Sequence, residues 1–197
     1  MGKKIQLNLF DLKPKRGRKP LKPSHQFGGM YLMNYNPNSK RPMDSKKALH
    51  LVLRSSRAIG ARSFKHQDHE EKIWSLIRTH AENCGVRIYE YGNGGNHLHL
   101  LIRAKHRDDY NRFIRIITGL IARLVGKSER GKPLNGKFWD ARPFTRIVSF
   151  TKREFQIAKT YLLRNTLEAI GWMPYIPRHR KLPAELRQWL MAAIPSS

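Results

Sequence analysis

Two histidines separated by one leucine, His97 and His99, are the residues whose types and spacing most directly indicate chemistry. They lie in an apolar run that is typical of a strand, and side chains at i and i+2 of a strand point to the same face. Their two imidazoles could therefore chelate one divalent cation. The same pattern also fits two half-buried polar residues on a solvated strand face, and the pair by itself leaves both interpretations open.

A tyrosine and an asparagine four residues apart, Tyr161 and Asn165, would lie on one face of a predicted helix. A phenol with a pKa near 10 is a poor nucleophile, but it can attack a phosphodiester whose developing charge a metal ion neutralises. Asn165 could supply an amide oxygen to that metal. The alternative is a core aromatic and a surface amide, because the chain has seven tyrosines and spacing alone does not select one.

Other candidates have weaker support. His50 lies on a predicted strand, on the face opposite its leucines, and we favour a structural role for it. Arg142 and Arg146 follow aromatic residues and could clamp phosphates, although solvated arginines beside core aromatics fit equally well.

The charge of the chain favours a polyanionic partner. Its 197 residues include 39 Lys and Arg against 14 Asp and Glu, a formal net charge of +25, and nucleic acid is the first expectation. The one cysteine excludes a disulfide framework. Without a signal peptide or an apolar run long enough for a membrane, we expect a cytoplasmic protein, bacterial and nucleoid-associated when bound to DNA, with no membrane partner.

A basic segment opens the chain, with eight Lys or Arg and one acid in residues 1–23. Within it, Arg16, Arg18 and Lys19 loosely resemble an AT-hook, which enters the minor groove of A·T-rich duplex. We favour a solvated tail with unspecific affinity for phosphates.

The positions of the candidates depend on the order of the elements. Alternation and helical periodicity predict strand, helix, strand, strand, helix, strand and a further helix, at residues 48–54, 67–84, 87–91, 97–103, 107–125, 138–149 and 152–170. Residues 24–45 read as irregular. This order is the ferredoxin-like, split βαβ arrangement of the α+β class, an antiparallel sheet with two helices on one face. The leucines should pack under those helices, leaving the histidine face open for a partner or for the extra helix, which carries Tyr161.

Two segments together resemble a known family. Asn96-His97-Leu98-His99-Leu100-Leu101 resembles the HUH motif (His, hydrophobic, His) of single-tyrosine transposases. The segment from Tyr161 to Ala169 is similar to the tyrosine helix of the REP-associated tyrosine transposases, which usually read Tyr-x-x-x-Asn-Pro. Thr166 stands here in place of the proline. The resemblance maps the nucleophile to Tyr161 and the metal ligands to His97, His99 and Asn165.

The resemblance implies a metal-dependent endonuclease and strand transferase that acts on single-stranded DNA. Tyrosine would form a 5′-phosphotyrosine link, a 3′-OH would later resolve it, and Mg²⁺ or Mn²⁺ would be the cofactor. The expected partner is single-stranded DNA with hairpins or palindromic repeats. The expected organisation is a basic extension at 1–45, a catalytic domain at 46–171 and a C-terminal extension with a short helix at 172–197.

Two alternatives remain from the sequence. One is a non-catalytic nucleic-acid binder on the same fold, which would want exposed aromatics on the central strands. The other is a domesticated transposase that binds repeats without mobilising them. Oligomeric state and target sequence stay open.

Overall fold

The structure is a computed structural model that describes residues 26–28, 41–128, 135–177 and 180–193. It contains one five-stranded sheet in the order β1-β5-β2-β4-β3, with every neighbouring pair antiparallel. The strands are β1 (Gln26–Phe27), β2 (Ala48–Arg54), β3 (Val86–Asn93), β4 (His97–Ala104) and β5 (Phe144–Val148). The predicted α+β, ferredoxin-like sheet is confirmed, because β2 to β5 have that arrangement and pairing.

Two strands differ from the sequence-based expectation. Strand β1 lies inside 24–45, where irregular structure was expected, and it pairs with the outer edge of β5. The last strand begins at Phe144, not at residue 138. Proline has no N–H for the ladder at position 143, and the preceding residues instead bond to the end of β2, where the amide of Asp140 donates to the carbonyl of Arg54 (3.0 Å).

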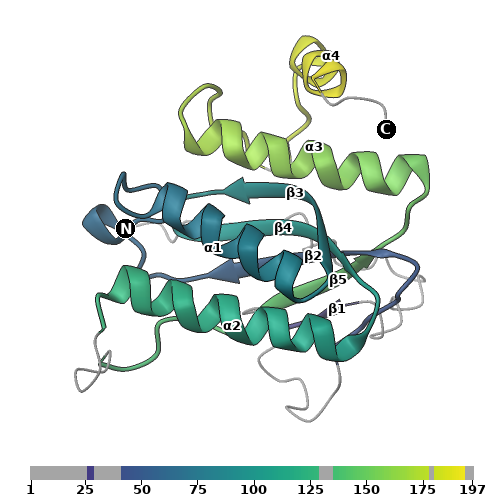
Figure 1. Ribbon diagram of the computed structural model, residues 1–197. Helices are drawn as coiled ribbons and strands as arrows, with labels where there is room; N and C mark the ends of the chain where they lie inside the picture. Colours follow the sequence, from purple (N-terminus) through teal and green to yellow (C-terminus); the bar gives the residue numbers. More distant parts are fainter. Residues whose placement is uncertain (1–25, 29–40, 129–134, 178–179, 194–197) are drawn as a thin grey trace, which may run out of the picture.

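The helices divide between the two faces of the sheet (Figure 1). Helices α1 (Glu70–Asn83) and α2 (Arg107–Gly126) cover one face, whereas α3 (Lys152–Ala169) packs on the other and runs beside β3. Helix α4 (Ala184–Ala192) follows, and Leu190 packs there with Leu167 of α3. A 3₁₀ turn at Gly60–Arg62 lies between β2 and α1. None of the helices described has the length and apolar character to cross a bilayer.

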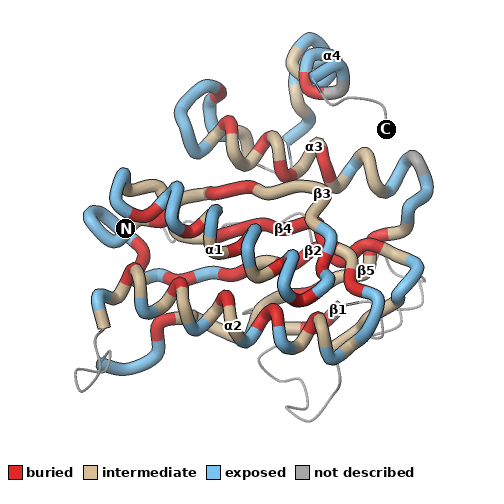
Figure 2. The backbone as a smooth tube through the Cα atoms, in the orientation of Figure 1, coloured by how far each residue is buried: buried red, intermediate tan, exposed pale blue. Residues whose placement is uncertain are grey.

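The main core lies between the leucine face of the sheet and the apolar stripes of α1 and α2. Figure 2 shows buried residues along the central strands and the inner sides of these helices. Each such side chain contributes roughly 1.5–3 kcal/mol when fully buried. The predicted packing of the leucine face is therefore confirmed. The buried residues of this core include Leu49, Leu51, Leu53, Leu98, Leu100 and Ile102 of the sheet, and Ile73, Ile77, Phe113, Ile117 and Ile121 of the two helices.

A smaller core forms on the opposite face, where α3 docks. Leu162 of α3 is buried there with Ala48, Leu101 and Val148 of the sheet. Of the two expected occupants of the histidine face, a partner or the extra helix, the structure places the extra helix α3 on it. The physical reason is the apolar side of α3, which the sheet removes from water.

Candidate functional site

The two histidines of β4 lie side by side on the face that α3 covers. Their ring centroids are 4.8 Å apart and the rings are nearly perpendicular. His99 is 3% exposed, whereas His97 is half-buried nearer the hairpin end of the strand. The pair is therefore asymmetric, with one imidazole in the interior and one towards solvent.

Tyr161 reaches the same place from α3. Its ring centroid is 5.6 Å from that of His99 and 5.9 Å from that of His50 on β2. The four rings of His50, His97, His99 and Tyr161 form what we call the histidine–tyrosine cluster. Two of its members are the predicted metal ligands of β4 and one is the predicted nucleophile.

A glycine on β3, Gly92, lies where α3 packs closely on the sheet. A Cβ on Gly92 would lie 3.1 Å from Oγ1 of Thr166 and 3.5 Å from the carbonyl oxygen of Leu162. An added methyl group would press on the side chain of Thr166, which would have to shift by a few tenths of an ångström, and Tyr161 precedes Leu162 on that helix. Thr166, at the position where the resembled helix usually has proline, also donates to the carbonyl of Leu162 (3.1 Å).

The second helical candidate is oriented within its own helix. Nδ2 of Asn165 donates to the carbonyl oxygen of Tyr161 (2.7 Å), which ties the amide to the backbone of the tyrosine. Glu168, one turn further along, accepts from Nε of Arg164 (2.9 Å). The structure therefore couples Asn165 to Tyr161, and pairs Glu168 with a cation on its own helix.

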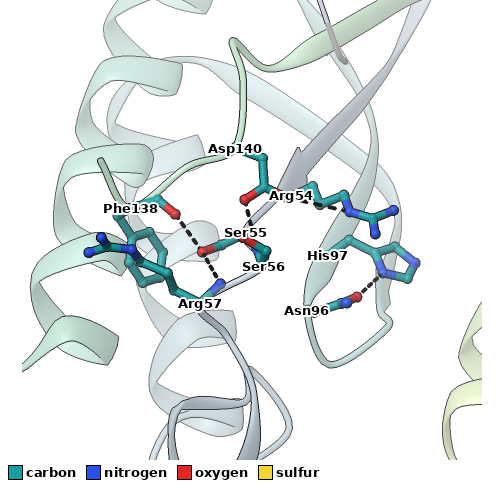
Figure 3. A network of polar contacts seen from close by, with 8 residues as sticks. All are labelled: Arg54, Ser55, Ser56, Arg57, Asn96, His97, Phe138 and Asp140. Carbon is teal, nitrogen blue, oxygen red and sulfur yellow. Dashed lines mark hydrogen bonds and ion pairs between the residues drawn. The ribbon is translucent and has the colours of Figure 1, made fainter. Parts of the chain in front are cut away.

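Both histidines of β4 have their Nδ1 atoms engaged by a neighbour. Nδ1 of His97 lies 2.7 Å from Oδ1 of Asn96 (Figure 3), and since an amide oxygen only accepts, the hydrogen belongs to the imidazole. Nδ1 of His99 lies 3.1 Å from Nε2 of His50. When His99 is the donor in this bond, both side chains carry their hydrogen on Nδ1 and have the lone pair on Nε2. That tautomer suits a metal ligand.

His50, for which the sequence favoured a structural role, belongs to the candidate site. It is 3% exposed, and its ring stacks on that of His99 with centroids 5.3 Å apart. Burial, together with the nearby charge of Arg146, lowers the pKa of His50 to about 3, so the imidazole is neutral near pH 7. Strand alternation predicts that His50 shares a face with Ala48 and Val52, opposite the leucines. Only the register of β2 against β4 brings it next to His99.

Another glycine fits the ring of His97. A Cβ on Gly94 would lie 2.3 Å from Cε1 and 2.5 Å from Nε2 of this imidazole, which is closer than real atoms approach. The hairpin closes with the amide of Gly94 donating to the carbonyl of His97 (2.9 Å). The absence of a side chain at this position therefore permits the observed orientation of the ring.

The arginines predicted to contact DNA fall in different places. Arg146 of β5 pairs in register with His50 and so shares its face. Arg142 is exposed in the turn before β5. Burial lowers the pKa of Arg41, and the positive charge of Arg142 lowers it further. Arg16, Arg18 and Lys19 lie outside the residues that the structure describes.

Within the described parts of the chain, no group of three or more His, Cys, Asp or Glu side chains could hold a metal ion. A metal at the histidine–tyrosine cluster would therefore need ligands of another kind beside His97 and His99, such as an amide oxygen, water or a substrate oxygen. Asn165 offers an amide oxygen one turn along α3 from Tyr161.

Comparison with known proteins adds family membership to this geometry. Residues 45–165 match the family described as "Transposase IS200 like". A search of the curated proteins finds no match. Among solved structures, a candidate transposase from Deinococcus radiodurans R1 is 17% identical, with a TM-score of 0.41, over 64% of this chain and 96% of that one. Because the matched residues are more than half of the sequence and include all four rings of the cluster, this chain belongs to the IS200-like transposase family.

Proposed function

We propose that this protein is a metal-dependent endonuclease and strand transferase of the HUH single-tyrosine type, acting on single-stranded DNA with hairpins or palindromic repeats. Membership of a transposase family makes DNA the substrate class. The observation that carries the finer proposal is the approach of Tyr161 to His99. Their ring centroids are 5.6 Å apart, although the two residues are 62 positions apart in the chain.

The metal ligands in this proposal are His97, His99 and Asn165. The donor set fits a divalent ion: Asn96 accepts from Nδ1 of His97, and with His99 as the donor to His50, both Nε2 atoms carry the lone pairs that bind the metal. The amide of Asn165 is held through Nδ2, and its oxygen is the donor atom. Mg²⁺ or Mn²⁺ would be the ion, and Mn²⁺ binds imidazole more readily. When bound, the ion would polarise the scissile phosphate and neutralise charge that develops on its oxygens.

Tyr161 supplies the nucleophile. Its Oη attacks phosphorus, the bond from phosphorus to the 3′ oxygen breaks, and the departing 3′ oxygen takes up a proton while Tyr161 loses one. The products are a 5′-phosphotyrosine and a free 3′-OH, and attack by a 3′-OH on the phosphotyrosine rejoins the strand. The phosphodiester energy is kept in the covalent link, so no nucleotide cofactor is needed.

Single-stranded DNA is the form of substrate that suits this site. Tyr161 and His99 lie between a helix and a sheet, and a strand whose bases can be splayed apart reaches such a site more easily than a duplex. The net charge of +25 favours a folded, highly charged strand.

The test is covalent capture. A strand that carries a palindromic repeat from the DNA flanking the coding region is incubated with the full chain and Mn²⁺, beside its perfect duplex. We expect a protein–DNA adduct on a denaturing gel for the hairpin-bearing strand and none for the duplex, and EDTA should abolish it. Equal cleavage of both forms, or an adduct that survives EDTA, would contradict the proposal.

A further inference from the structure

Arg54 is the last residue of β2, directly opposite His97 of β4. Cross-strand partners share one face of a sheet, and their Cβ atoms are roughly 4.5–5.5 Å apart. Figure 3 shows the guanidinium of Arg54 and the imidazole of His97 projecting to the same side of the two strands. The side chain of Arg54 is 42% exposed, so this cation is accessible to solvent on the face of the sheet that carries His97.

The position of Arg54 is fixed by a network around Asp140 (Figure 3). Oδ2 of Asp140 lies 3.6 Å from Nε of Arg54, and Oδ1 accepts from the amide of Ser56 (2.7 Å). The amide of Asp140 donates to the carbonyl of Arg54 (3.0 Å), and that of Ser55 donates to the carbonyl of Asn96 (2.9 Å). The end of β2 is thereby bound to Asp140 and to the residue before His97.

A contribution to the stability of the fold does not by itself explain why residue 54 is an arginine. Ion pairs that reach solvent contribute little to folding. Two hydrogen bonds would hold the segment without the charge of Arg54: the one from the amide of Asp140 to the carbonyl of Arg54, and the one from the amide of Ser56 to Oδ1 of Asp140. The contact with Asp140 is through Nε, on one edge of the guanidinium. The two Nη atoms are further donors, arranged in a fork that matches two oxygens of a phosphate.

We propose that Arg54 forms a binding site for a backbone phosphate of the DNA strand that lies across His97, with Asp140 holding the guanidinium in place. The identity of the strand rests on the proposed function. The ligand class is a phosphodiester, which two guanidinium nitrogens bind through charge-assisted hydrogen bonds. A lysine would keep the charge but lose both the contact through Nε and the fork.

The test measures binding without cleavage. The hairpin-bearing strand is titrated in EDTA into the full chain carrying Tyr161→Phe, at several salt concentrations. Adding Arg54→Gln should weaken binding about fivefold to tenfold and lower the slope of log affinity against log salt by about 0.7, the value for one phosphate of a single strand. Arg54→Lys should retain the slope and recover only part of the affinity.

Arg57→Gln is the matched control, because it removes one positive charge three residues away. The Arg57 guanidinium points away from His97 in Figure 3 and donates to the carbonyl of Asn135. We expect less than a twofold change for it, and Arg54→Gln should keep the Mn²⁺ affinity and melting temperature of the parent. Equal effects of Arg54→Gln and Arg57→Gln would overturn the proposal, even if the wild type forms its covalent adduct. A protein that forms no adduct but loses binding with Arg54→Gln would instead refute the proposed function alone.

Discussion

Nε2 of His50 and Nδ1 of His99 share a hydrogen bond of 3.1 Å between neighbouring strands, 49 residues apart in the chain. The bond gives the buried His99 a defined orientation and, with His99 as donor, places its lone pair on Nε2. His97 obtains the same tautomer from Asn96, its neighbour in sequence. The two predicted metal ligands are thus oriented by two different residues, one local and one brought in by the fold.

Substitutions of His50 can distinguish a role in orienting His99 by a hydrogen bond from a role in packing alone. We expect His50→Leu to weaken Mn²⁺ binding about tenfold to a hundredfold, as loss of an outer-shell partner does. His50→Gln should stay within a few fold of the wild type, because the amide oxygen can accept from Nδ1 of His99. Calorimetric titration of Mn²⁺ gives both values. Equal losses in the two variants would show that His50 only packs.

The nucleophile is tested by a substitution that keeps its ring. Tyr161→Phe should abolish the covalent adduct, because only Oη is removed, while DNA affinity stays within about twofold and the fold stays intact. Phenylalanine keeps the aromatic ring through which Tyr161 contacts His50 and His99. Denaturing gels report the adduct, and an adduct formed by Tyr161→Phe would refute the assignment.

The metal ligands should differ in their contributions. His97→Ala and His99→Ala should each reduce Mn²⁺ affinity to the limit of detection and abolish cleavage. Asn165→Ala should have a smaller effect, because water can replace one neutral amide ligand. Calorimetry with Mn²⁺ checks this order directly. Unchanged affinity in both histidine variants would mean that the pair is structural.

Gly94 should affect metal binding because the imidazole of His97 lies directly against it. In Gly94→Ala the new methyl group overlaps the imidazole of His97, which must turn away from Asn96, and we expect Mn²⁺ affinity to fall about tenfold. Gly119→Ala in α2 is the matched control, since no atom that could obstruct the added methyl lies within 4 Å. It should leave metal affinity unchanged and stabilise the helix by about 0.5–1 kcal/mol. The same loss in both variants would argue against the contact with His97.

The basic tail should raise affinity without selecting the cut. Its eight cations could contribute at most about 5 to 6 to the salt slope, at about 0.7 for each phosphate. Deleting residues 1–23 should therefore lower the slope by a few units and weaken binding at low salt, with the cleavage position unchanged. An unchanged slope would place the tail off the DNA. A shifted cleavage position would show that the segment with Arg16, Arg18 and Lys19 reads sequence.

The sequence by itself determined what depends on local periodicity. Alternation placed His97 and His99 on one face and the leucines on the other, and helical spacing placed Tyr161 and Asn165 on one side of a helix. The order of strands and helices was enough to predict the ferredoxin-like sheet, because few arrangements bury such a set of apolar faces. Family resemblance then selected Tyr161 from seven tyrosines.

Only the tertiary structure decided which distant residues meet. The register of β2 against β4 brings His50 to His99 and Arg54 to His97, and a shift by one residue would turn both away from the cluster. The docking of α3 on the sheet, where it passes Gly92, places Tyr161 beside the histidines. Asp140, which is isolated in the sequence, meets Arg54 because the chain after α2 folds back onto the end of β2. These contacts depend on cross-strand pairing and on close packing between elements, for which local patterns carry no signal.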